Sequence, residues 1–192
     1  MPNENFEQLL QRVRQCTVCQ ANLPQPPRPV FAASETAKIV IIGQAPGIKA
    51  HDSTTPWNDA SGDRLRDWTG IDRTTFYDVK RVALIPMGFC FPGYKNGADA
   101  PPRKECAPIW HHQLISRIAP ELIILAGRYA QQYYLPTYRT LTEAVAQHNL
   151  MQSTKIVLPH PSGRNNRWLT RNPWFAEDIL PRLKAQVARI LQ

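Results

Sequence analysis

The sequence predicts an α/β protein: a short, mostly parallel four-stranded sheet between two helical layers, in a three-layer α/β/α arrangement. The first observation is a set of short, β-branched apolar runs without polar alternation, such as residues 39–43, typical of strands buried on both faces. The second is that amphipathic segments of helical length separate these runs, as expected when helices cover both sides of a parallel sheet. With 192 residues, the chain is expected to form one domain, residues 1–192.

Each element rests on a local pattern. Apolar residues spaced three and four apart from Phe6 to Val13 predict an N-terminal amphipathic helix. Apolar runs predict four strands, at residues 38–43, 81–86, 121–126 and 155–159. Further helices are predicted at 61–68 and 104–119, as two short helices within 128–147, and as a closing helix from Phe175 to Ile190, and a short helix or turn is predicted at 72–78. Polar, Gly-rich or Pro-rich stretches at 20–36, 48–59 and 88–103 predict loops.

Charge and composition narrow the class of protein. The chain carries 23 Lys and Arg against 15 Asp and Glu, and this net charge of +8 favours a polyanionic partner, nucleic acid first. It has no apolar run long enough for a membrane span, so we expect no membrane partner. The first residues lack a basic segment followed by an apolar one, so we expect no signal peptide. We therefore expect a cytoplasmic protein, and we expect it to be a monomer.

Four cysteines predict a metal centre. Cys16 and Cys19 form a C-x2-C pair, and Cys90 and Cys106 follow later in the chain. Disulfides are rare in cytoplasmic proteins, whereas four thiolates suit a tetrahedral zinc ion or an iron–sulfur cluster. Zinc ribbons usually contain two such pairs, so one pair with two scattered cysteines favours iron–sulfur and leaves zinc as the alternative. We expect the centre to be structural.

Two polar turns at the ends of predicted strands define the candidate site. Gly43-Gln-Ala-Pro-Gly47 follows the first strand, and His160-Pro-Ser-Gly-Arg-Asn165 follows the last. Open α/β sheets bind ligands at the carboxyl ends of their strands, where glycine lets a ligand approach bare backbone N–H groups. The two turns together favour a ligand site over ordinary strand–helix connections.

These turns resemble the paired motifs of the uracil-DNA glycosylase superfamily, and the cysteine spacing resembles its iron–sulfur branch, often called family 4. The resemblance includes Pro56-Trp57 and Gly62 and covers roughly residues 10–170. It implies a base excision repair enzyme that flips a deaminated base, uracil above all, out of DNA and hydrolyses its N-glycosidic bond. It also implies a 4Fe–4S cluster at the cysteines.

The resemblance and the chemistry of the reaction assign roles to individual residues. Bond cleavage leaves negative charge on the base, and His160 is the expected catalytic donor that stabilises it, together with Gln44. Trp57 stands where the family has a Phe that stacks on the flipped base, a contact worth about 1–3 kcal/mol. The other expected base-binding residues are Gly43, Ala45, Asn58 and Asn96, and the expected DNA-binding residues are Ser162, Gly163, Arg164 and Asn165.

The chain departs from the family pattern at three positions. Ala45 stands where the best-known branch has an Asp that activates or positions water, and Gln44 replaces the Glu of the iron–sulfur branch. Pro86 replaces an Asn that reads the uracil edge. Glutamine cannot act as a general base, although it can orient water. Asp52 and Asp59 lie nearby in the sequence and are interpreted as ordinary loop residues.

These departures leave two other functions open. The first is a catalytically weak or inactive protein of the same fold that binds damaged or single-stranded DNA. The second is an enzyme for another modified base or for free nucleosides, which would lack the steep salt dependence of DNA binding.

Overall fold

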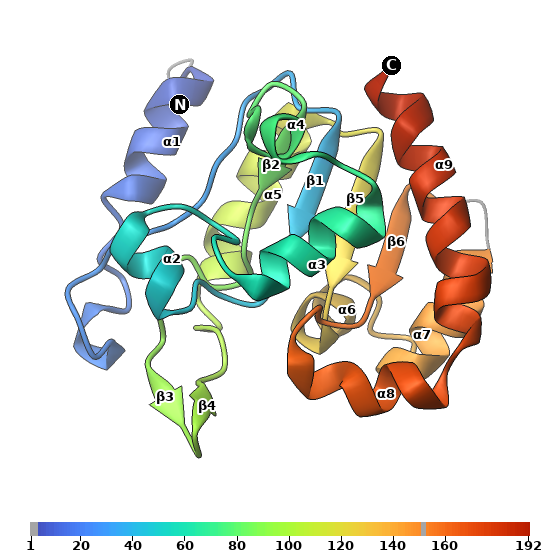
Figure 1. Cartoon of the computed structure of the whole chain (residues 1–192). Coiled ribbons are helices and arrows are strands. Elements are labelled where there is room, and N and C mark those ends of the chain that lie inside the picture. The colour runs from blue at the N-terminus through green and yellow to red at the C-terminus, as the bar shows by residue number, and fades with distance from the viewer. Residues whose placement is uncertain (1–3, 151–152) are drawn as a thin grey trace.

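A parallel four-stranded sheet lies at the centre of the described residues, 4–150 and 153–192, in the computed structural model (Figure 1). Its strands are β1 (Ile39–Ile42), β2 (Val82–Leu84), β5 (Leu122–Ala126) and β6 (Lys155–Leu158), in the spatial order β2-β1-β5-β6. Ile41 pairs with Leu84 on one side and with Ile124 on the other. The expected α/β class and the parallel four-stranded sheet are confirmed.

Helices cover both faces of this sheet. In Figure 1, α3 (Ala60–Thr69) lies on the near face and α5 (Cys106–Ile118) on the far face. The others are α1 (Phe6–Arg14), α2 (Ile48–Ser53), α4 (Arg73–Tyr77), α6 (Arg128–Tyr134), α7 (Leu141–Gln147), α8 (Asn166–Arg171) and α9 (Leu180–Leu191). Short 3-10 turns occupy Gln20–Asn22, His148–Leu150 and Gly163–Asn165, and a π-helical turn, Phe175–Ile179, leads into α9. Across the described part of the chain, no helix is long and apolar enough to cross a membrane.

The core forms where the two helical layers meet the sheet. All residues of β1, β2 and β5 are buried, which explains why their sequences are apolar without alternation. Leu65 of α3 and Leu114 of α5 are fully buried in the same cluster. Each such side chain contributes about 1.5–3 kcal/mol by leaving water, so the sheet and its two layers stabilise one another.

Three segments differ from the sequence-based expectation. The loop expected at 88–103 contains a small antiparallel hairpin, β3 (Tyr94–Lys95) paired with β4 (Ala98–Asp99). Its turn residues, Asn96 and Gly97, have φ angles of 51° and 70°, the conformation that favours Asn-Gly in two-residue hairpins. The hairpin projects from the body of the molecule (Figure 1). Two further stretches not expected to be helical form α2 and α8.

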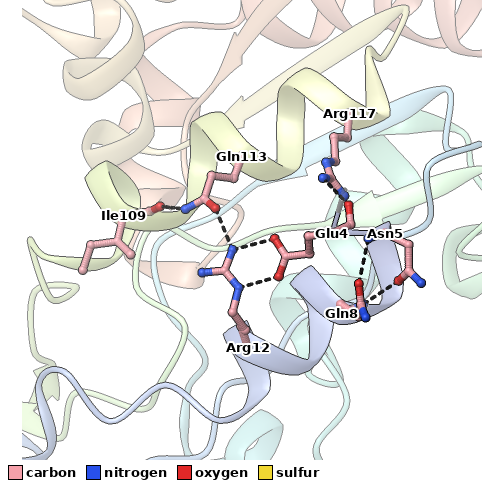
Figure 2. A network of polar contacts seen from close by, with 7 residues as sticks. All are labelled: Glu4, Asn5, Gln8, Arg12, Ile109, Gln113 and Arg117. Carbon is pink, nitrogen blue, oxygen red and sulfur yellow. Dashed lines mark hydrogen bonds and ion pairs between the residues drawn. The ribbon is translucent and has the colours of Figure 1, made fainter. Parts of the chain in front are cut away.

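A polar network joins α1 to α5 (Figure 2). Arg12 donates to both carboxylate oxygens of Glu4, at 2.6 and 2.9 Å, and to the side-chain oxygen of Gln113 at 2.9 Å. Arg117 donates to the backbone carbonyl of Glu4 at 2.6 Å. The start of α1 therefore lies beside the end of α5, and the two helices run antiparallel. This places the chain that follows α1 near Cys106, the first residue of α5.

A buried histidine links α5 to the end of the second strand. The His111 Nε2 atom lies 3.0 Å from the carbonyl oxygen of Pro86, and Nδ1 lies 2.6 Å from the hydroxyl of Tyr134. A carbonyl only accepts, so Nε2 carries the proton and a neutral ring accepts the Tyr134 hydroxyl at Nδ1. Burial lowers the pKa of His111 from 6.5 to about 4, and the Pro86 carbonyl opposes this shift.

The free energy of unfolding is expected to fall as the pH drops from about 6.5 to 4. In that range His111 binds a proton in the unfolded chain but not in the folded protein. The free energy of unfolding therefore falls by about 1.4 kcal/mol per pH unit, and the total decrease approaches about 3 kcal/mol. Urea unfolding of the wild type and of His111→Gln between pH 4 and 8 measures this term. His111→Gln should flatten the dependence, whereas His112→Gln, at the exposed next residue, should keep it. An unchanged slope in His111→Gln would contradict the assignment.

Candidate active site

An open cavity of about 480 Å³ lies at the carboxyl edge of the sheet. Parallel strands end at the same edge, so the turns after β1 and β6 meet there. Both turns line the cavity, joined by Trp57, by the β3–β4 hairpin and by the start of α6. The volume falls in the range of small-ligand sites.

The turn after β1 is held by the chain that carries the hairpin. The carbonyl oxygens of Gly43 and Gln44 accept hydrogen bonds from the backbone N–H groups of Met87 and Gly88, at 2.9 and 3.0 Å. The Gln44 side chain donates to the carbonyl oxygen of Ala100 at 3.3 Å. Gln44 therefore joins the turn to the residue that follows β4.

Trp57 forms one wall of the cavity in a strained backbone conformation. Its φ angle is 56°, which is rare for a bulky residue and clusters at functional sites. A Cβ on Gly43 would lie 2.5 Å from the indole Cζ2 atom, and a Cβ on Gly62 would overlap the Trp57 carbonyl oxygen. The Tyr77 hydroxyl lies 3.1 and 3.2 Å from the carbonyl oxygens of Pro56 and Trp57. Two glycines and one hydroxyl thus fix the position of this indole.

His160 lies beside Trp57 at the end of β6. The two rings stack with centroids 5.5 Å apart and planes inclined by 28°. The side chain retains some access to the cavity, but the surrounding protein lowers the pKa of His160 by desolvation, against a smaller opposing effect of Asp59. At neutral pH the imidazole is therefore uncharged and offers one N–H donor.

The loop after His160 is braced from three sides. The Asn165 side chain donates to the His160 carbonyl oxygen at 2.7 Å. Arg64 of α3 donates to the carbonyl oxygen of Ser162 at 3.3 Å, and Arg164 donates to that of Gly97 at 2.7 Å. The loop and the hairpin therefore meet across the cavity mouth, with cationic side chains at their junction.

The structure brings most of the expected site residues together. Those that line the cavity are Gly43, Gln44, Ala45, Trp57, His160, Ser162, Arg164 and Asn165. Gly163 belongs to the same loop and starts its 3-10 turn. Asn58 and Asn96 are not among the lining residues: Asn58 contacts Ser53 and Arg73, and Asn96 forms the hairpin turn. Neither asparagine is placed to read a base in this cavity.

Sequence reasoning missed the contribution of the hairpin, above all Asp99. Its Oδ2 atom lies 3.3 Å from the position that a Cβ on Gly47 would take, at the end of the β1 turn. The side chain reaches solvent through the open cavity, yet desolvation raises its pKa, Arg164 opposes the shift and Asp59 adds to it. Asn96-Gly97 signals a hairpin, but nothing local indicates that its second strand ends with Asp99 beside Gly47.

The four cysteines lie in the chain after α1, in the loop after β2 and at the start of α5. Cys19, Cys90 and Cys106 are buried and Cys16 is half-buried. Burial raises the pKa of Cys90 to about 12 and that of Cys106 to about 11, and the neighbouring thiols, Cys16 and Cys19 among them, add to both shifts. Within residues 4–150 and 153–192, no three His, Cys, Asp or Glu side chains form a group that could hold a metal ion. The thiols are thus neighbours without a preformed ligand shell.

The sequence model of the Uracil DNA glycosylase superfamily matches residues 30–184, and the chain therefore belongs to that superfamily. Among solved structures, it is similar to the solution NMR structure of a "putative Uracil DNA glycosylase" from Methanosarcina acetivorans. The identity is 18% and the TM-score 0.49, and the match covers 84% of this chain and 96% of the other.

Replacing Gly62 with Ala is expected to displace Trp57. The new Cβ would overlap the Trp57 carbonyl oxygen, which is backbone and cannot swing away, so the free energy of unfolding should fall by about 1–3 kcal/mol. Urea unfolding measures the loss. Gly163→Ala is the matched control, because a Cβ there meets no atom within 4 Å. Equal stability of the two variants would show that Trp57 is not held in this way.

Proposed function

We propose that this protein is a DNA glycosylase that hydrolyses the N-glycosidic bond of a deaminated base, uracil first, after the base has left the duplex. The observation that carries the proposal is the pairing of Trp57 with an uncharged His160 inside a cavity of small-ligand size. Membership of the superfamily supports a DNA glycosylase-like activity. The choice of uracil rests on the motif resemblance.

Base binding follows from the cavity wall. A flipped base needs a pocket that replaces the stacking it loses, and an aromatic face supplies about 1–3 kcal/mol of that stacking. Trp57 offers such a face next to His160. Because Gly43 and Gly62 fix the indole before any ligand binds, the Trp57 side chain loses little conformational entropy on binding.

Bond cleavage follows from the charge state of His160. As the N-glycosidic bond breaks, its electron pair leaves with the base and the negative charge spreads to the base carbonyl oxygens. A neutral imidazole N–H aimed at such an oxygen stabilises this charge by hydrogen bonding and keeps its own proton. Burial maintains the neutral form, since it lowers the pKa of His160.

DNA binding follows from the charge around the cavity mouth. Arg164 and Arg128 line the cavity, and Arg64 braces the loop that carries Ser162. These groups and the net charge of +8 suit the phosphates on either side of a flipped nucleotide. Affinity for DNA is therefore expected to fall steeply with salt.

The test is single-turnover cleavage of an oligonucleotide with one uracil, single-stranded or opposite G or A, with protein in excess. Alkali-labile breakage at the uracil is expected, and His160→Gln should lower the rate constant by about 10²–10³-fold, because a preorganised donor is lost. His112→Gln, on the exposed surface of α5, is the control and should match the wild type.

Three results would contradict parts of this proposal. Equal rates for wild type and His160→Gln would remove the role of His160. Cleavage of hypoxanthine or xanthine but not of uracil would change the substrate. Salt-dependent binding to uracil-containing DNA without an abasic product from any of these bases would favour the alternative of a protein that binds DNA without cleaving it. The lack of a carboxylate at Ala45 is the observation that supports this alternative.

We further propose that Cys16, Cys19, Cys90 and Cys106 hold a structural 4Fe–4S cluster, with zinc as the alternative. The support is that three of the four thiols are buried and that Cys16, Cys19 and Cys106, which are distant in sequence, all raise the pKa of Cys90. Burial and neighbouring thiols raise these pKa values and so keep the free thiols protonated, whereas a bound metal cation would displace the protons and stabilise the thiolates. Ligation would join the chain after α1 to both ends of the hairpin loop.

Anaerobically purified protein is expected to be brown and to contain iron and acid-labile sulfide. Cys106→Ser should lose most of this iron and lower the free energy of unfolding, because one of four ligands is gone. Ser116→Ala, on the exposed surface of the same helix, is the control and should retain it. Colourless protein with stoichiometric zinc would overturn the iron assignment and leave the four-thiol site intact.

A further inference from the structure

Hydrolysis of an N-glycosidic bond adds water to the sugar. The turn after β1 carries no carboxylate that could accept a proton from that water. Ala45 has no polar side chain, and Gln44 has no basic group and is bonded to Ala100. The carboxylates that line the cavity are Asp59 and Asp99. Asp59 and Asp99 are therefore the two candidates for a carboxylate that accepts a proton from the water.

The Asp59 carboxylate already has a structural role. It is the N-cap of α3, and its carboxylate accepts the backbone N–H of Gly62 at 2.9 Å. Within the described part of the chain, the Asp99 side chain makes no hydrogen bond, and none contributes to its pKa shift. Its carboxylate faces the cavity with both oxygens available, and solvent reaches it there.

The hairpin holds Asp99 in place at three points. The Ala100 N–H donates to the Gly93 carbonyl oxygen at 2.8 Å, which closes the base of the hairpin. Gln44 donates to the Ala100 carbonyl oxygen, one residue after Asp99, and Arg164 donates to the Gly97 carbonyl oxygen, two residues before it. The turn after β1 and the loop after β6 are thus each hydrogen-bonded to the hairpin, one on either side of Asp99.

We propose that Asp99 is the catalytic general base that receives a proton from the hydrolytic water. This inference rests on the proposed function and assigns to a hairpin residue a role for which the β1 turn offers no group. As the N-glycosidic bond breaks, its electron pair leaves with the base. The water oxygen bonds to C1′ of the sugar, and one water proton passes to the Asp99 carboxylate. Solvent returns that proton to the base, so water is divided between an abasic sugar hydroxyl and a neutral base.

The surroundings of Asp99 suit a base of this kind. Desolvation and Asp59 raise its pKa, and Arg164 limits the rise. His160, Arg128, Tyr94 and Tyr129 complete the ionisable groups around the cavity. A carboxylate with a raised pKa takes a proton more readily than an ordinary one while remaining a base above that pKa.

The test compares Asp99→Asn with Asp178→Asn, the same change at an exposed position on the π-helical turn before α9. Single-turnover rate constants on the uracil oligonucleotide are measured from pH 4 to 8, and DNA affinity by titration. Asp99→Asn is expected to lose about 10²–10⁴-fold in rate with DNA affinity within about twofold of wild type, because only proton transfer is removed. The fall in rate at acid pH should also disappear. Asp178→Asn should match the wild type.

A second variant separates chemistry from structure. Asp99→Ala removes the carboxylate and leaves space, so added formate is expected to restore part of the lost rate, and added chloride is not. A rate loss that formate does not restore, with DNA affinity falling in proportion, would overturn the proposal in favour of a structural hairpin. Wild-type cleavage with an equal rate in Asp99→Asn would overturn this assignment alone. Absence of cleavage of any base by the wild type would overturn the proposed function and this step with it.

Discussion

The packing of Trp57 against two glycines is the constraint on which the candidate site depends. The indole lies over Gly43 at the end of β1, and its carbonyl oxygen occupies the space that a side chain on Gly62 would need. This packing accommodates a positive φ angle at a bulky residue, which costs about 1–3 kcal/mol when nothing compensates it. The strain is therefore stored in the site by the rigid elements around it, β1 and α3.

The same packing sets the electrostatics of the cavity. The Trp57 ring stacks on His160, and desolvation by the surrounding protein is the main reason for the lowered pKa of His160. An uncharged donor suits a reaction that develops negative charge, because it can strengthen its hydrogen bond without first losing a proton. The protein environment of His160 thus includes the stacked indole and favours the uncharged ring.

The hairpin joins two parts of the molecule that are distant in sequence. It lies between Cys90, in the loop after β2, and Cys106, at the start of α5. The network of Glu4, Arg12, Gln113 and Arg117 holds α1 against α5 (Figure 2). The segment from Cys90 to Cys106 therefore connects the cysteines to the carboxyl edge of the sheet, and Asp99 lies within it.

The sequence by itself determined the four strands, most of the helices and the two site turns. Buried strands need continuous apolar residues and turns need glycine, so the strands at residues 39–43 and 155–159 can be predicted from the local sequence alone. Only the tertiary structure decided that Asn58 and Asn96 stay outside the cavity and that Asp99 enters it. Those outcomes depend on contacts between distant segments, such as Gln44 with Ala100 and Arg164 with Gly97. No local periodicity encodes them, because contacts between distant segments set where a hairpin lies relative to the rest of the fold.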